Sequence, residues 1–146
     1  ALEPFERDAS GEGPYAVQYA LQDMMQDLVG IVRTESEMVR ALNGLDALKA
    51  RAKKAGVGGH REYNPGWHAA LDLPNLLTAS EAITRSAIER KESRGGHFRE
   101  DYPDKDPAFG TFNIVVKRAA DGSMEVSRAP IPEMPAELKE VVDEMK

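Results

Sequence analysis

PYAVQYALQDMMQDLVGI, residues 14–31, carries the pattern from which the fold class of this chain is inferred. Its proline stands where helices favour one, at the first helical position. Apolar side chains then recur at spacings of 4, 3, 4 and 3 residues, at Val17, Leu21, Met24, Leu28 and Ile31. This heptad spacing is typical of a helix packed lengthwise against other helices. We therefore predict a helix from Pro14 that belongs to a bundle.

A second helix is predicted to follow at once. Thr34-Glu35-Ser36-Glu37 forms a capping box, with threonine at the cap and glutamate three residues later. The expected apolar face of this helix consists of Met38, Leu42, Leu45, Leu48 and Ala52. Gly56 ends the helical pattern, and residues 56–63 are interpreted as a connection.

Asn64-Pro65 opens a third helical region by the same logic of cap and proline. We expect Pro74 to divide it into a short helix, Pro65 to Leu73, and a longer one that ends at Gly95-Gly96. The buried face of the longer helix is expected to carry Leu76, Ser80, Ile83 and Ala87.

After the third helix the apolar period changes from that of a helix to that of a strand. Phe112, Ile114 and Val116 alternate with other residues, and Asp121-Gly122 favours a hairpin turn. Pro135 begins a short amphipathic helix. The predicted fold is mainly α, an antiparallel three-helix (spectrin-repeat-like) bundle followed by a small β-hairpin and a short C-terminal helix. We expect residues 1–13 to form a junction, 14–104 the bundle, and 105–146 a hairpin and tail packed on the bundle or on a neighbouring domain.

Composition excludes several classes of function. The 146 residues suit one domain, and a net charge of −6 argues against a nucleic-acid binder. The chain has no cysteine and no apolar run of 18 residues, which excludes thiol chemistry and a membrane span. The start lacks the pattern of a signal peptide and reads like an internal junction, so we expect a cytoplasmic location.

Isolated polar motifs do not predict a catalytic centre. His60, His68 and His97 lack the spacing of metal ligands on one helix face, so no metal site is predicted. The glycines of residues 56–59 follow a helix rather than a strand, so a flexible connector is favoured over a phosphate loop. A small hydrolase that uses the carboxylates of residues 92–106 ranks last among the functions considered, because nothing in the sequence specifies a pocket.

RKESRGGHFREDYPDKD, residues 90–106, is the stretch of the chain that most strongly indicates a functional surface. Acidic and basic residues alternate closely enough to neutralise one another, which favours an ordered surface of ion pairs. Gly95 and Gly96 allow a sharp turn, and Arg94 and His97 on either side of it suit the binding of a carbonyl or carboxylate group. A helix end with solvated charges and a recognition surface both remain open.

Four blocks of residues resemble the C-terminal helical domain of the flavoprotein subunit of succinate dehydrogenase and fumarate reductase, which is also found in L-aspartate oxidase. The blocks lie in family order from about Pro14 to Ile131. They are Leu21-Gln22 to Met25 with Val29-Gly30-Ile31 and Arg33; Asn64-Pro65 with Ala70-Leu71-Asp72-Leu73 and Asn75-Leu76-Leu77; Ser86-Ala87, Arg90, Glu92-Ser93-Arg94-Gly95, His97, Arg99 and Asp101-Tyr102-Pro103; and Asp121-Gly122 with Pro130-Ile131. The third block is the most specific. Gly96 departs from the family, which usually has alanine there, and residues 105–110 replace a longer passage.

The resemblance implies a parent protein that interconverts succinate and fumarate with FAD and passes electrons to an iron–sulfur subunit. The family's flavin-binding and substrate-binding motifs are absent here, so no catalytic or cofactor-binding residue is assigned, and the chain alone is expected to be inactive. The resemblance implies a parent complex at the cytoplasmic face of the inner membrane. Its implied docking residues toward the flavin-binding domain of the same polypeptide are Arg90, Glu92, Arg94, His97, Arg99 and Asp101.

Two alternatives accompany this interpretation. The chain could be a free-standing helical adaptor that binds a protein partner through the turn from Arg90 to Asp106. Separated from a flavin domain, it could also expose an apolar face and form a homodimer.

Overall fold

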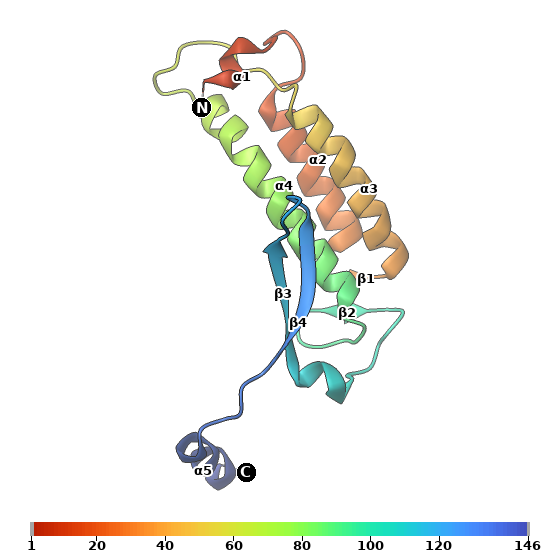
Figure 1. Ribbon diagram of the computed structural model, residues 1–146. Coiled ribbons are helices and arrows are strands. Elements are labelled where there is room, and N and C mark those ends of the chain that lie inside the picture. Colours follow the sequence, from red (N-terminus) through yellow and green to blue (C-terminus); the bar gives the residue numbers. More distant parts are fainter. Residues whose placement is uncertain (1, 146) are drawn as a thin grey trace.

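The computed structural model describes residues 2–145 and confirms the predicted fold class. Three helices lie side by side with alternating directions, and a two-stranded hairpin lies along the last of them (Figure 1). The helices are α1 (Glu3–Glu6), α2 (Pro14–Val29), α3 (Glu35–Ala52), α4 (Pro65–Glu89) and α5 (Ala136–Glu144), with a 3₁₀ turn η1 (Pro107–Gly110). The strands are β1 (Val32–Arg33), β2 (Phe98–Arg99), β3 (Phe112–Arg118) and β4 (Met124–Pro130).

The core lies between α2, α3 and α4. Its buried cluster consists of Val17, Leu21, Leu45, Leu48, Ala55, Leu73 and Leu77. The predicted seam of α2 is largely confirmed, except that Ile31 is 68% exposed and Val29 is buried instead. The reason is that α2 ends at Val29 and the chain turns into β1 before it reaches Ile31.

The predicted capping box of α3 is present. The N–H of Glu37 donates to Thr34 Oγ1 (3.3 Å), and the N–H of Thr34 donates to Glu37 Oε2 (2.8 Å). Asn64 likewise caps α4 by accepting from the N–H of Trp67 (3.2 Å). Each cap satisfies an N–H that the first turn of a helix leaves without a partner.

Helix α4 corrects the prediction of a break at Pro74. The helix continues through the proline, which is exposed, while Leu73 and Leu77 on either side of it are buried in the core. The hydroxyl of Thr78 donates to the Pro74 carbonyl (2.7 Å). Packing of the two leucines therefore outweighs the one hydrogen bond that the proline cannot make.

The buried face of α4 was predicted only in part: Ala87 is buried as expected, and Leu76 and Ile83 are not. Leu76 and Ile83 are 39% and 54% exposed, because the unbroken helix carries its apolar stripe onward from Leu73 and Leu77. Its buried residues are Leu73, Leu77, Thr84 and Ala87. The hydroxyl of Thr84 donates to the Ser80 carbonyl (2.8 Å), so this polar residue is buried with a partner.

The end of α4 is the third correction. The helix ends at Glu89, where Arg90 takes an extended backbone conformation, and not at the glycine pair. Gly95 does have the expected left-handed conformation (φ 59°), but in the turn that follows. That turn can therefore fold against other parts of the chain.

The hairpin β3–β4 is confirmed, with pairing from Phe112 opposite Pro130 to Arg118 opposite Met124. Arg128 of β4 forms an ion pair with Glu89 of α4 (2.7 Å), which ties the hairpin to the bundle.

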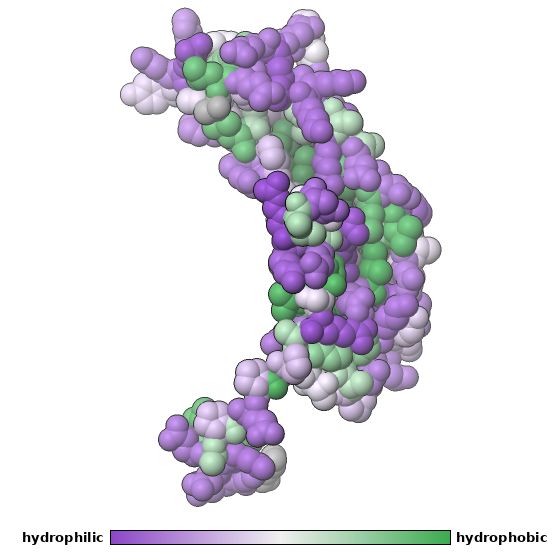
Figure 2. Space-filling view, viewed as in Figure 1, coloured by the Kyte–Doolittle hydropathy of each residue, from purple (hydrophilic) through white to green (hydrophobic). Residues whose placement is uncertain are grey.

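Helix α5 forms as predicted but buries none of its residues, and Figures 1 and 2 show it apart from the rest. Residues 1–13 include α1, whose buried Pro4 accepts a hydrogen bond from the N–H of Val57 (2.9 Å). The division into units at residues 13 and 104 stays a prediction.

Candidate functional site

The charged turn is held against the bundle by a short parallel pairing of strands. Val32 lies opposite Phe98, and Arg33 lies opposite Arg99. In both strands the first residue is exposed and the second is buried. The two arginines therefore point inward from neighbouring strands.

Hydrogen bonds within the turn fix its shape. Arg94 and His97 exchange backbone bonds of 2.8 and 3.1 Å across the glycine pair. The hydroxyl of Ser93 accepts from the N–H of Arg99 (2.9 Å) and donates to the carbonyl of Tyr102 (2.8 Å). The stretch is thus an ordered structure rather than a solvated linker.

Glu92 is the centre of the first group of ion pairs. Its side chain is fully buried (0% exposed), although it is charged. Arg94 donates to both of its carboxylate oxygens (2.8 and 2.9 Å), the N–H of Asp106 donates to Oε2 (3.0 Å), and Arg90 also donates to Oε1. The hydrogen bond from Arg94, the backbone bond and Arg90 together lower the pKa of Glu92 from 4.5 to about 2, against the opposing effect of burial.

Arg99 is the centre of the second group and is also fully buried. It donates to both carboxylate oxygens of Asp101 (2.7 Å each) and to the carbonyl of Ala87 at the end of α4 (3.0 Å). Asp101 also accepts from the N–H of Glu35, the first residue of α3 (3.0 Å). The hydrogen bonds from Arg99 lower the pKa of Asp101 to about 2. This group joins the turn to both α3 and α4.

All six residues predicted for docking therefore lie in or beside one network. Arg90, Glu92 and Arg94 form the first group, Arg99 and Asp101 the second, and the ring Nε2 of His97 lies 3.0 Å from the Arg90 carbonyl oxygen. Glu92 and Arg99 are buried inside this chain, so their contacts here are internal. The docking role of the group stays a prediction.

Arg33 lies in this region but is not among the six residues predicted for docking. Its side chain is only 9% exposed, and its Nε is buried without a hydrogen-bond partner among residues 2–145. Burial, and secondarily the charge of Arg99, lowers the pKa of Arg33. The only signal in the sequence was its place after Val29-Gly30-Ile31 in the family resemblance.

Arg33 lines an open depression of about 560 Å³ between β1, α4 and β3. The other residues that line it are Ala82, Ile83, Ser86, Ala87, Arg90, His97, Asn113 and Ile114. None of them is acidic. Burial, followed by the neighbouring charges of Arg33, Arg99 and Arg90, lowers the pKa of His97 against the opposing bond to the Arg90 carbonyl.

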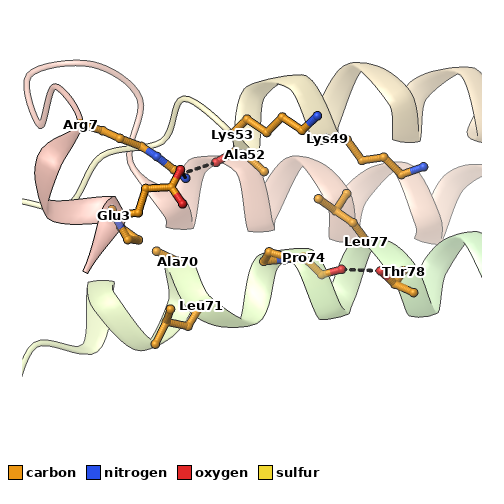
Figure 3. A pocket seen from close by; sticks show the side chains of 11 residues that line it. Glu3, Arg7, Lys49, Ala52, Lys53, Ala70, Leu71, Pro74, Leu77 and Thr78 are labelled. Atoms are coloured by element: carbon orange, nitrogen blue, oxygen red, sulfur yellow. Dashed lines mark hydrogen bonds and ion pairs between the residues drawn. The ribbon is translucent and has the colours of Figure 1, made fainter. Parts of the chain in front are cut away.

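A second hollow, of about 390 Å³, lies at the other end of the bundle between α1, α3 and α4 (Figure 3). Arg7 reaches across it and donates to the carbonyls of Ala52 (3.0 Å) and Ala55 (3.1 Å). Lys49 is paired with Asp46 and Glu81. Arg7 and Lys49 therefore already have partners within the chain.

The arrangement favours recognition of an anion over acid–base chemistry. Glu92 and Asp101 are held ionised by arginines, and a general acid near neutral pH needs a raised pKa instead. Among residues 2–145, no three His, Asp or Glu side chains come together as metal ligands. No helix in the same range is long and apolar enough to cross a membrane.

Comparison with known proteins finds similar sequences over most of this chain. Residues 18–143 match the model of the family described as "Fumarate reductase flavoprotein C-term". The fumarate reductase flavoprotein subunit of Mycobacterium tuberculosis is 30% identical over 122 residues, which are 83% of this chain and 21% of the relative. The L-aspartate oxidase of Streptomyces coelicolor is 30% identical over 125 residues, 84% of this chain and 21% of that protein. The chain thus spans about a fifth of the length of these curated relatives.

A solved structure has a similar fold over nearly all of this chain. Mycobacterium smegmatis Sdh1 in complex with UQ1 superposes with a TM-score of 0.88 and 38% identity. The match covers 97% of this chain and 24% of the Sdh1 chain.

Proposed function

Since this chain belongs to the family of fumarate reductase flavoprotein C-terminal domains, we propose that it is the scaffold and docking domain of a succinate dehydrogenase or fumarate reductase flavoprotein. The partner domain would bind FAD and move a hydride between succinate and the flavin. The iron–sulfur subunit would then accept the electrons, in a complex at the cytoplasmic face of the inner membrane.

The observation that carries the proposal is the superposition on Sdh1. Nearly all of this chain is matched, yet the match takes up only 24% of the longer chain. A match that covers this chain almost completely and about a quarter of the longer one supports the role of one domain of a larger protein. The resemblance inferred from the four sequence blocks is confirmed by the family match.

The charged turn suits such a role. The group around Arg99 holds the turn against α3 and α4. The group around Glu92 fixes the turn internally and leaves Arg94 with 41% of its side chain exposed. Charges at an interface set orientation more than they add affinity. We propose that Arg94 and His97 orient the domain on the flavin-binding domain.

In the adaptor alternative, the same turn binds another protein partner. The family match and the similar structures support the flavoprotein domain more strongly than this adaptor. The proposed experiment is native mass spectrometry of this chain mixed with its parent flavoprotein truncated before this domain. We expect a one-to-one complex and a recovery of succinate oxidation with an artificial electron acceptor. A folded chain that forms only monomers or homodimers in the mixture would contradict the proposal.

A matched pair of full-length flavoprotein variants tests the orienting role. Arg94→Ala should lower flavin content or melting temperature, whereas Arg40→Ala, on the exposed side of α3, should leave both unchanged. Equal behaviour of the two variants would contradict the role given to Arg94.

A further inference from the structure

We propose that the depression around Arg33 is a receptor for one carboxylate side chain of the flavin-binding domain. This inference rests on the proposed function and identifies the contact through which the two domains meet. Arg33 of β1 thereby joins Arg94 and His97 of the glycine turn as a docking residue.

Arg33 has no ion-pair partner among residues 2–145. A guanidinium group has five N–H donors, and arginine stays charged in proteins, so a buried arginine is normally paired. Arg33 is 9% exposed, its Nε has no partner, and no ion pair to any described residue exists. Its burial therefore indicates that a partner comes from outside residues 2–145.

The side chains that line the depression include basic residues and no acidic one. Arg90 and His97 line the same depression, and the charge of Arg99 acts on Arg33 from the neighbouring strand. The nearby carboxylates are already engaged, Glu92 by Arg90 and Arg94 and Asp101 by Arg99. An incoming carboxylate would thus meet Arg33 without competition from an acidic residue in the lining of the depression.

The apolar residues of the depression indicate the kind of ligand that it binds. Ile83 and Ile114 line the depression together with two alanines, and Ile83 is 54% exposed. Apolar walls around a few convergent charges are typical of the core of a protein interface, which excludes water from the ion pair. The similar Sdh1 chain has about three quarters of its length outside the match, which is ample for a domain that covers this face. These features favour a side chain of the flavin-binding domain over a free anion.

Thermal unfolding of Arg33→Met in two contexts gives the first test. In this chain alone, the substitution removes an unpaired buried charge and keeps the apolar volume, so the melting temperature should stay unchanged or rise. In the full-length flavoprotein the same substitution should lower it by several degrees, because the partner carboxylate loses its cation. A decrease of equal size in both contexts would overturn the inference, since Arg33 would then stabilise only its own domain.

Zero-length cross-linking of the full-length flavoprotein gives the second test and identifies the partner. A carbodiimide joins an amine to a carboxylate only where the two are in contact. In Arg33→Lys, peptide mass spectrometry should find position 33 linked to one Asp or Glu of the flavin-binding domain, and Arg40→Lys should not give this link. A link confined to carboxylates of this chain, or no link from position 33, would overturn the inference.

A titration separates a side chain from a small anion. Succinate or inorganic phosphate at about 10 mM should not raise the melting temperature of this chain beyond the increase seen in Arg33→Met. A rise that depends on Arg33 would assign the depression to a free anion and overturn the docking role.

If mass spectrometry finds a one-to-one complex but position 33 does not cross-link, only this inference fails. If mass spectrometry finds no complex, the result contradicts the proposed function itself.

Discussion

The network around Glu92 and Arg99 and the depression around Arg33 each contain a buried arginine but differ in their balance of charge. In the network, each buried charge has an opposite charge and backbone partners at hydrogen-bond distance. In the depression, Arg33 is buried with no hydrogen-bond partner for its Nε among residues 2–145, and no carboxylate lines the space around it. The first region is complete within the chain, whereas the second requires a partner. Buried charge alone therefore does not distinguish a structural group from a binding site, but its pairing does.

Loss of Arg99 should break the network most severely. Arg99→Met would leave Asp101 and the carbonyl of Ala87 without their donor, and breaking a buried pair typically costs about 3–5 kcal/mol. Urea denaturation of this chain should show a decrease of that order in the free energy of unfolding.

The matched control is Arg128→Met, which removes an ion pair whose arginine is 51% exposed. It should reduce the free energy of unfolding by about 1 kcal/mol or less. Equal effects of the two variants would mean that the network at Arg99 contributes no more than a surface pair.

The network should also make stability depend on acid. The pKa values of Glu92 and Asp101 lie at about 2 in the folded chain, below their ordinary values of 4.5 and 3.8. A depressed folded pKa stabilises the fold above the ordinary pKa, and the contribution is lost as the pH falls toward the folded value. We expect the free energy of unfolding to decrease between about pH 4.5 and pH 2.

Glu92→Gln sharpens this prediction. The variant should lose about 2–3 kcal/mol at pH 7, because Arg90 and Arg94 lose a buried carboxylate, and it should depend less on pH in the acid range. Denaturation curves at several pH values would measure both effects. An unchanged acid dependence would show that the titration of Glu92 does not control acid stability.

Substitutions in the glycine pair should have the smallest effect on the free energy of unfolding. Gly95 has φ 59°, so Gly95→Ala should cost about 1 kcal/mol, although no heavy atom lies within 4 Å of the added Cβ. Gly96 does not have a left-handed φ, and its surroundings are equally open, so Gly96→Ala should be neutral or stabilise by about 0.5 kcal/mol. A reversed order of the two melting temperatures would contradict this account of the turn.

Local chemistry in the sequence predicted most of the fold. The caps at Thr34 and Asn64 and the turn at Asp121-Gly122 depend on neighbouring residues, and each is present. Pro74 misled the prediction because a local rule was applied where core packing of Leu73 and Leu77 decides the outcome.

The site was predictable only in part. Alternating charges and two glycines indicated an ordered turn in residues 90–106. The burial of Glu92 and Arg99 depends on contacts with α3 and α4 that no spacing in the sequence reveals. The pairing of β1 with β2 spans only two residues in each strand, too few for a periodic pattern, so the position of Arg33 remained hidden.

That pairing also has a consequence for how the chain folds. It joins segments far apart in sequence, as does the bond from Arg99 to Glu35, which closes a separation of 64 residues. Contacts that close long loops form at an entropic disadvantage, so we expect them to follow the docking of α2, α3 and α4. Substitutions at Arg99 should then accelerate unfolding more than they slow refolding. The depression around Arg33 would be the last surface to take shape, and a flavin-binding domain would meet it only on a chain whose bundle is already assembled.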